Sequence, residues 1–301
     1  MKIEVKHVSK GFKNKKVVKD ISFELDSNEC MALIGPNGAG KTTLIKMIVG
    51  VLETDTGAVY MDGKKMDKQK KWIGYLPQTP QFFQWMTANE TLYFMGELSG
   101  IFKEILAKEI PLVLEKVGLS DSKHQKIGGF SGGMKQRLGI AQAILHKPAF
   151  LVMDEPVSAL DPIGRREVLT ILEELKKETA IIFSTHILSD ASEICERFFM
   201  MKAGEMILDS SAEDLLNQQV SNQLLIRFVG YYPELLEKLK AQSWITKVNE
   251  TPQQWIIEVE ELLEHKEEVL RMLIEEHVNL VTFDVKKESL EELFLKEVVG
   301  S

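Results

Sequence analysis

Short apolar runs in the first two thirds of the chain predict buried strands, because the runs are too brief to form helices. These runs are residues 3–8, Ile21–Leu25, Met31–Ile34, residues 57–63, Trp72–Leu76, Phe150–Met153 and residues 181–183. Apolar residues at helical spacing follow residue 41, and a helical pattern also fills residues 86–147. Strands that alternate with helices predict an α/β fold, with a helical subdomain inserted at about residues 86–147.

A lysine-rich stretch lies between the first two predicted strands. Its lysines are Lys10, Lys13, Lys15, Lys16 and Lys19. We expect a polar bend here, with Phe12 in the turn after the first strand. A solvated edge is the expected role of these lysines, and an anion-facing patch is the alternative.

The pattern starts again after the polar stretch at residues 217–222. Extended and helical segments then follow at residues 224–228, 233–242, 244–248, 254–259, 262–276 and 281–285. This β-α-β-β-α-β order is ferredoxin-like and predicts a small α+β domain. We therefore expect a first domain of residues 1–220 and a second of residues 221–301, which adds a last helix at 289–298.

Composition narrows the class of protein. Hydrophobic residues make up 44% of the 301 residues, enough for proper cores, and the net charge is -8. Residues 216–301 carry 9 Lys and Arg against 16 Asp and Glu, which argues against general nucleic-acid affinity. Cys30 and Cys195 suggest neither a disulfide framework nor a zinc site, and they fit a reducing cytosol. No signal-peptide core and no apolar stretch of about 20 residues is present, so we expect a chain that does not cross a membrane.

The stretch from Gly35 to Leu44, GPNGAGKTTL, fits the phosphate-loop pattern G-x-x-x-x-G-K-[ST]. It follows the predicted strand Met31–Ile34 and runs into a helix, which is the context that the motif needs. Glycines let backbone N–H groups approach phosphates closely, and the N-terminus of the helix favours an anion. Lys41 can reach the β- and γ-phosphates, and the Thr42 hydroxyl can complete a Mg²⁺ shell. The pattern therefore predicts nucleotide binding.

Polar side chains follow several of the predicted strands. Asp154 and Glu155 end the run Phe150–Met153, and His186 ends a similar run. Ligands of open α/β sheets bind at the carboxyl ends of strands, so these side chains are expected beside the phosphate loop. Residues 128–133, Gly-Gly-Phe-Ser-Gly-Gly, form a second glycine-rich helix start inside the helical region, which by itself is a weak signal for phosphate binding.

The order of these segments resembles the ATPase subunit of ATP-binding cassette (ABC) transporters. The matching segments are Phe12, GPNGAGKT, Gln78, FSGGMKQR, LVMDEP, SALD and STH, over about residues 2–215. The resemblance implies a P-loop NTPase fold with an inserted helical subdomain. The signature segment departs from the common family form at Phe130 and Met134, whereas Ser131, Gly132 and Gly133 are intact. The closing text KESLEELFLKEV resembles, more weakly, cassettes of multidrug, antibiotic-resistance and lipid exporters.

The resemblance also implies the roles of single residues. ATP would be bound by Phe12, which stacks on adenine, by Gly35, Pro36, Asn37, Gly38, Ala39, Gly40, Lys41, Thr42 and Thr43, and by Ser131, Gly132 and Gly133 of a second subunit. Mg²⁺ would be held by Thr42, Gln78 and Asp154. Glu155 would activate the attacking water, with His186 at the γ-phosphate and Gln78 beside them. Asp161 would communicate with the opposite subunit.

The expected function is therefore that of an ATP-hydrolysing subunit. It would dimerise on ATP, with a second copy as the expected partner, and drive a separate membrane permease, with export favoured by the resemblance. The expected place is the cytoplasm, peripheral on the inner face of the cell membrane, and no nucleic-acid partner is expected. Two alternatives stay open: a soluble cassette ATPase that acts on ribosomes or DNA, and a regulatory module that binds ATP without hydrolysing it. The second domain is expected to be regulatory or to support the dimer.

Overall fold

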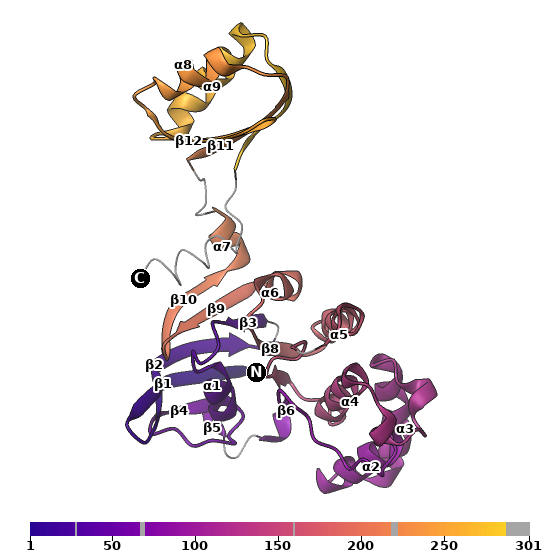
Figure 1. The fold of residues 1–301 in the computed structure, drawn as a ribbon. Coiled ribbons are helices and arrows are strands. Elements are labelled where there is room, and N and C mark those ends of the chain that lie inside the picture. The colour runs from indigo at the N-terminus through magenta and orange to yellow at the C-terminus, as the bar shows by residue number, and fades with distance from the viewer. Residues whose placement is uncertain (28, 67–69, 159, 218–221, 287–301) are drawn as a thin grey trace. The chain divides into compact units, whose positions relative to one another are not determined.

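The computed structural model describes residues 1–27, 29–66, 70–158, 160–217 and 222–286. The chain forms two compact units, the first of Met1–Ala212 and the second beginning at Glu213 (Figure 1). The boundary predicted at residue 220 falls later, among residues 218–221, which lie outside the described residues.

A six-stranded sheet forms the centre of the first unit. Its strands are β3 (Cys30–Ile34), β6 (Ile73–Leu76), β7 (Phe150–Met153), β8 (Ala180–Thr185), β9 (Arg197–Lys202) and β10 (Glu205–Ser211). They lie in the order β10-β9-β3-β8-β7-β6, and all neighbours are parallel except β10, which pairs antiparallel with β9. The carboxyl ends of β3, β8, β7 and β6 therefore meet at one edge of the sheet.

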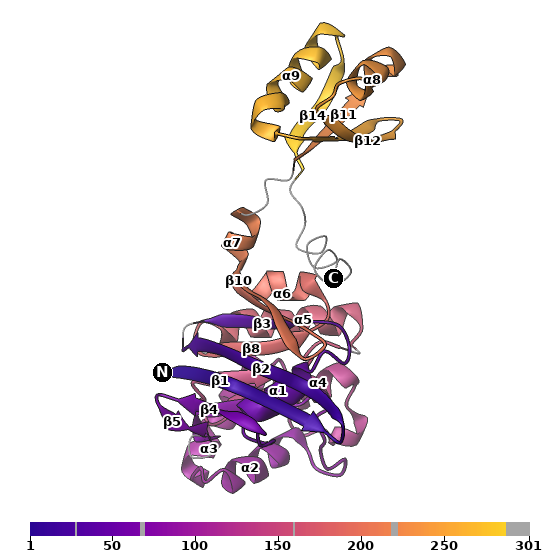
Figure 2. The same cartoon turned by 90° about the vertical axis from the view of Figure 1, so that its left-hand side faces the viewer.

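A second, antiparallel sheet contains β1 (Lys2–Phe12), β2 (Lys15–Asp26), β4 (Thr56–Met61) and β5 (Lys64–Lys65), in the order β2-β1-β4-β5. Figure 2 shows β1, β2 and β4 side by side in this unit. The predicted bend is shorter than expected: it consists of Lys13 and Asn14, and the placement of Phe12 in the turn is wrong, because Phe12 ends β1 and pairs directly with Lys15 of β2. Backbone pairing between the strands satisfies the peptide groups, so polar side chains extend the strand instead of breaking it. Lys10 and Lys19 bind Asp55 and Glu205, which agrees with a solvated edge.

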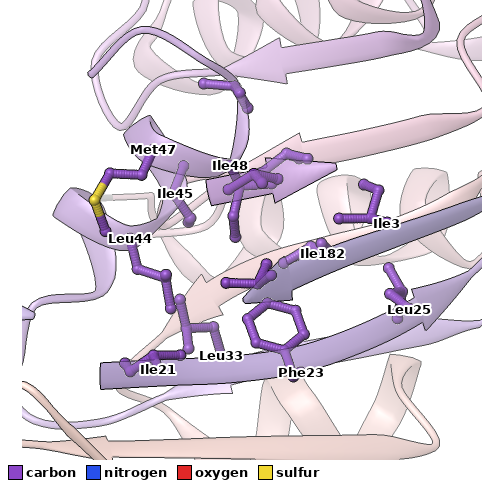
Figure 3. Packing of buried hydrophobic residues seen from close by; sticks show 14 of the residues in the cluster. Ile3, Ile21, Phe23, Leu25, Leu33, Leu44, Ile45, Met47, Ile48 and Ile182 are labelled. Atoms are coloured by element: carbon purple, nitrogen blue, oxygen red, sulfur yellow. The ribbon is translucent and has the colours of Figure 1, made fainter. Parts of the chain in front are cut away.

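Helix α1 (Lys41–Ile48) supplies the apolar residues that join the two sheets. Leu44, Ile45 and Ile48 are fully buried. Figure 3 shows them gathered with residues of the antiparallel sheet, such as Phe23, and of the central sheet, such as Leu33. The helix that carries the phosphate loop is thus held rigidly by the core.

The helical subdomain predicted at residues 86–147 contains α2 (Ala88–Leu98), α3 (Lys103–Lys116) and α4 (Gly132–Ile144). A capping box begins α2: the Thr87 hydroxyl accepts the Glu90 N–H, and the Glu90 carboxylate accepts the Thr87 N–H. Short 3-10 turns, η2 (Lys70–Trp72), η3 (Ser120–Ser122) and η4 (Ile127–Gly129), join neighbouring elements. Beyond the subdomain lie α5 (Pro162–Leu175), α6 (Leu188–Ile194) and α7 (Ala212–Asn217).

The two cysteines of the chain lie in this first unit. Cys30 and Cys195 are both buried free thiols, with their Sγ atoms 2.8 Å apart. Burial raises the pKa of the Cys195 thiol well above its usual value. Both act as small buried groups, as the sequence predicted.

The second unit has the predicted β-α-β-β-α-β order: β11 (Gln223–Val229), α8 (Pro233–Lys240), β12 (Ile245–Thr251), β13 (Gln254–Val259), α9 (Leu262–Glu275) and β14 (Asn279–Val285). Its antiparallel sheet has the order β12-β13-β11-β14. The unit has its own apolar core, around Phe228 and Trp255. The helix predicted at residues 289–298 lies outside the described residues. Among the helices that the structure describes, we find none with the length and apolar character that a membrane crossing requires.

Candidate functional site

The phosphate loop connects the end of β3 to the start of α1. All five residues of β3 are buried, so the strand fixes one end of the loop. Gly40 caps α1 with a φ of 108°, and a Cβ at this position would lie 2.5 Å from the Val17 carbonyl oxygen. Only glycine fits such a position, because the backbone is left-handed and another backbone segment lies against it. The loop therefore follows the path that the motif predicts.

Lys41 lies along the inside of the loop. Its side chain is 5% exposed, and its Nζ donates to the carbonyl oxygens of Gly35 and Pro36 at 2.6 and 3.2 Å. Burial lowers the pKa of Lys41, while the nearby carboxylates of Glu155 and Asp154 act in the opposite direction. An ammonium that is bonded to neutral carbonyl groups can exchange them for charged phosphate oxygens, which are stronger acceptors.

Asp154 directly follows strand β7 of the same sheet and is 1% exposed. Its Oδ1 accepts hydrogen bonds from the Thr42 hydroxyl at 3.1 Å and from the Ser184 hydroxyl at 2.7 Å. The predicted metal ligands Thr42 and Asp154 thus lie side by side, although one is in helix α1 and the other follows strand β7. Burial, followed by the charge of Asp154, raises the pKa of Tyr75 to about 12, so this neighbour stays a neutral phenol.

Glu155 lies at the centre of the remaining predicted residues. One carboxylate oxygen, Oε2, accepts from the Gln78 amide at 3.1 Å. The other, Oε1, lies 3.5 Å from His186 Nδ1 and 3.9 Å from Lys41 Nζ. Its side chain is only 11% exposed. A carboxylate placed between an amide, an imidazole and an ammonium can accept a proton from a water held at the same point.

Ser184 is a site residue that the sequence interpretation left without a role. Its hydroxyl donates to Asp154 Oδ1 and accepts the Glu155 backbone N–H at 2.9 Å. It can bridge both acids because its strand, β8, pairs with β7, which both acids follow. The polar end of the run at residues 181–186 was visible in the sequence, but the order of the strands was not.

Three of the predicted groups lie apart from this cluster. Ser131 caps α4 by accepting the Met134 N–H at 3.2 Å, and the nearest atom to a Cβ on Gly133 would be the Gly164 Cα, at 3.8 Å. Asp161 caps α5 by accepting the Gly164 N–H at 2.7 Å. Phe12 ends β1 with 48% of its surface exposed, and the Lys10 ammonium lies 6.0 Å from its ring centre. The described contacts join Lys41, Thr42, Gln78, Asp154, Glu155, Ser184 and His186, and among the described residues they do not reach these three groups. The Gly133 and Asp161 segments instead meet at Gly164.

The donor set beside Thr42 suits a magnesium ion that arrives with a nucleotide. Mg²⁺ is usually held by one or two protein oxygens together with phosphate oxygens and water. The structure offers one hydroxyl and one carboxylate here, and no group of three or more His, Cys, Asp or Glu side chains in the described residues forms a self-sufficient metal site.

Fold and site together define a P-loop ATPase: a phosphate loop before a helix, and two acids after another buried strand of the same sheet, the second of them beside a histidine and the lysine of the loop. Residues 18–158 match the model of the ABC transporter family. An uncharacterized ABC transporter ATP-binding protein of Bacillus subtilis, YxlF, is 44% identical over 98% of this chain and 99% of its own length. The chain belongs to the ABC transporter family and is an ATP-binding, ATP-hydrolysing subunit of such a transporter.

Two further comparisons support the same family. The linearmycin resistance ATP-binding protein LnrL of Bacillus subtilis is 33% identical, over 97% of each chain. A solved structure described as the ATP binding subunit of an ABC transporter has a TM-score of 0.65 and 32% identity, and it covers 72% of this chain and 93% of its own. These relatives do not favour the alternative of an ATPase that acts on ribosomes or DNA.

Proposed function

We propose that two copies of this subunit close over two ATP molecules and so drive a separate membrane permease, in the direction of export. Ser131, Gly132 and Gly133 of each copy complete the site of the other. The position of these three residues supports a shared site. Among the described residues of one chain, they have no contact with the phosphate loop and lie away from Glu155. The helix start at Ser131 presents free N–H groups that suit a phosphate.

The roles at the site follow from the contacts. Thr42, Asp154 and Gln78 would hold Mg²⁺, which offsets phosphate charge when it is bound. Lys41 binds the β- and γ-phosphates, and His186 donates to the γ-phosphate. Glu155 accepts the proton of the attacking water, and its position between Gln78, His186 and Lys41 is the single observation that carries the proposal. Phe12 stacks on adenine, and Asp161 contacts the opposite copy.

Glu155→Gln tests this assignment. The amide keeps the size of the carboxylate but cannot accept a proton, so turnover should fall by about 10²–10⁴-fold while ATP binding stays near normal. Because hydrolysis is blocked, the variant should form a stable ATP-dependent dimer. The measurements are phosphate release, and size-exclusion chromatography with light scattering in the presence and absence of Mg·ATP.

Glu173→Gln, on the exposed side of α5, is the matched control and should behave like the wild type. Wild-type turnover in Glu155→Gln would remove Glu155 from its role. Slow turnover without a dimer would instead contradict the shared site.

An exposed aromatic cluster supports docking to a permease. Phe83 and Trp85 follow Gln78 along the chain, and Phe94 lies on α2. The ring centre of Phe83 lies 5.7 Å from that of Trp85 and 6.2 Å from that of Phe94. Phe83 and Trp85 are 53% and 68% exposed. Exposed apolar patches of this kind mark protein interaction sites, and this one begins a short distance along the chain after Gln78, which contacts Glu155. We assign the cluster to the permease, which would hold the subunit at the inner face of the cell membrane.

Cell fractionation tests the docking surface. Phe83→Ser with Trp85→Ser should move the subunit from the membrane fraction to the soluble fraction, with its own ATPase activity unchanged. Leu263→Ser, which removes an equally exposed apolar side chain from the second unit, is the control. Membrane association that survives the double substitution would contradict this docking site, and sedimentation of the wild type with ribosomes would contradict the transport function.

Export is supported by the likeness to LnrL, whose name links it to antibiotic resistance.

The second unit holds none of the residues assigned to ATP. Its separate core supports a regulatory or dimer-supporting role.

A further inference from the structure

Two helices begin beside residues to which the proposed function gives a role. Helix α5 starts at Pro162, directly after Asp161, and α6 starts at Leu188, two residues after His186. The side chain of Asp161 caps α5, and the Arg165 N–H, one turn further, donates to the Asp161 carbonyl at 2.9 Å. A movement of either helix would therefore move the residue at its start.

An ion pair joins these helices one turn from both residues. Arg165 donates to Asp190 Oδ1 from Nε at 2.7 Å and also from Nη2, and Nη2 lies 3.5 Å from the Ser189 hydroxyl. Asp190 is 2% exposed, and its other oxygen, Oδ2, is buried without a hydrogen-bond partner in the described residues. Burial raises the pKa of Asp190, and Arg165 opposes this shift, as does the charge of a protonated His186.

A carboxylate in this environment is held by a single partner. The desolvation cost of a buried charge is large, and a half-satisfied buried acid is a poor way to stabilise a helix contact. A neighbouring pair, Arg166 with Glu193, joins the same two helices at the surface, with Arg166 64% exposed. If an ion pair served only to hold α5 against α6, the Arg166–Glu193 pair would do so without burying a carboxylate.

We propose that Arg165 and Asp190 are positioning residues, which couple the segment of Asp161 to the segment of His186 so that both move as one body. The inference rests on the proposed roles of Asp161 and His186. A displacement of Asp161, on contact with the second copy, is passed through α5 and the buried pair to α6 and so to His186. ATP binding by the phosphate loop does not pass through this pair.

Asp190→Asn in the full chain is the decisive variant, since it keeps the shape of the side chain and removes the buried charge. The coupling predicts that kcat for ATP falls by about 10- to 100-fold, because a small misplacement of a reacting group has effects of this size. KM should stay within about twofold, since phosphate binding is untouched. Asp190→Glu, which keeps the charge, should recover part of kcat, and Arg165→Met combined with Asp190→Asn should lose no more than the worse single variant.

Arg166→Met and Glu193→Gln are the matched controls, because they break the exposed pair between the same helices. Both should retain wild-type kcat, and thermal unfolding without nucleotide should show that Asp190→Asn is folded at the assay temperature. Wild-type kcat in Asp190→Asn would overturn the inference. An equal loss in the controls would also overturn it, since helix packing alone would then explain the effect. If Glu155→Gln loses activity while Asp190→Asn does not, the proposed function stands and only this coupling fails.

Discussion

At the scale of single residues, the site depends on a hydroxyl that links two acids. Ser184 donates to Asp154 and accepts the backbone N–H of Glu155, and it is fully buried. The two acids, Asp154 and Glu155, are thus both held by one side chain of the neighbouring strand β8. Their relative position is set by β8 as much as by β7, on which they follow.

Ser184→Ala should therefore reduce both activity and stability. The Glu155 N–H loses its partner, and a buried group left unsatisfied costs about 1–3 kcal/mol of unfolding free energy. We expect kcat to fall by about tenfold, since Glu155 is then free to shift. Urea unfolding and phosphate release measure the two effects. Ser192→Ala, which removes a hydroxyl that bonds only to carbonyls of its own helix, should change neither.

At the scale of elements, the phosphate loop shows how much of the site the sequence could predict. The spacing of Gly35 to Thr42 predicted the strand, the loop and the helix, because the motif encodes local backbone geometry. The strand pair β9 and β10 was not predicted, since a run such as Phe198–Met201 suits a strand or a buried helix equally. The role of Ser184 and the pairing of Lys15 with Phe12 depend on which strands become neighbours, and no local pattern carries that information.

Two glycines of the loop give a prediction at this scale. Gly38 and Gly40 both have positive φ, but a Cβ on Gly38 would meet nothing within 4 Å, whereas one on Gly40 would meet the Val17 carbonyl oxygen at 2.5 Å. Gly38→Ala should cost about 1–2 kcal/mol, the strain of a left-handed backbone. Gly40→Ala should cost clearly more, because the strand that carries Val17 must also move. Urea unfolding without nucleotide compares the two, and equal losses would contradict the close contact.

At the scale of the whole molecule, the ATPase residues and the second unit are separable. All residues assigned to ATP lie in Met1–Ala212, and the two units have separate apolar cores. A chain of residues 1–212 should therefore fold and bind ATP with near-wild-type affinity. Isothermal titration with a slowly hydrolysed ATP analogue measures this. A folded fragment that no longer binds would show that the second unit contributes to the site.

Glu155 also has a positive φ, of 47°, a conformation that is strained for a residue with a side chain. Selection for activity therefore favours glutamate at this position, whereas selection for stability favours a residue without a side chain. A screen of random variants for heat resistance alone should recover glycine at position 155, because glycine relieves about 1 kcal/mol of backbone strain and leaves the fold intact. Such a variant would be more stable but, given the proposed role of Glu155, would hydrolyse ATP far more slowly, so thermostability alone is a misleading criterion for improving this enzyme.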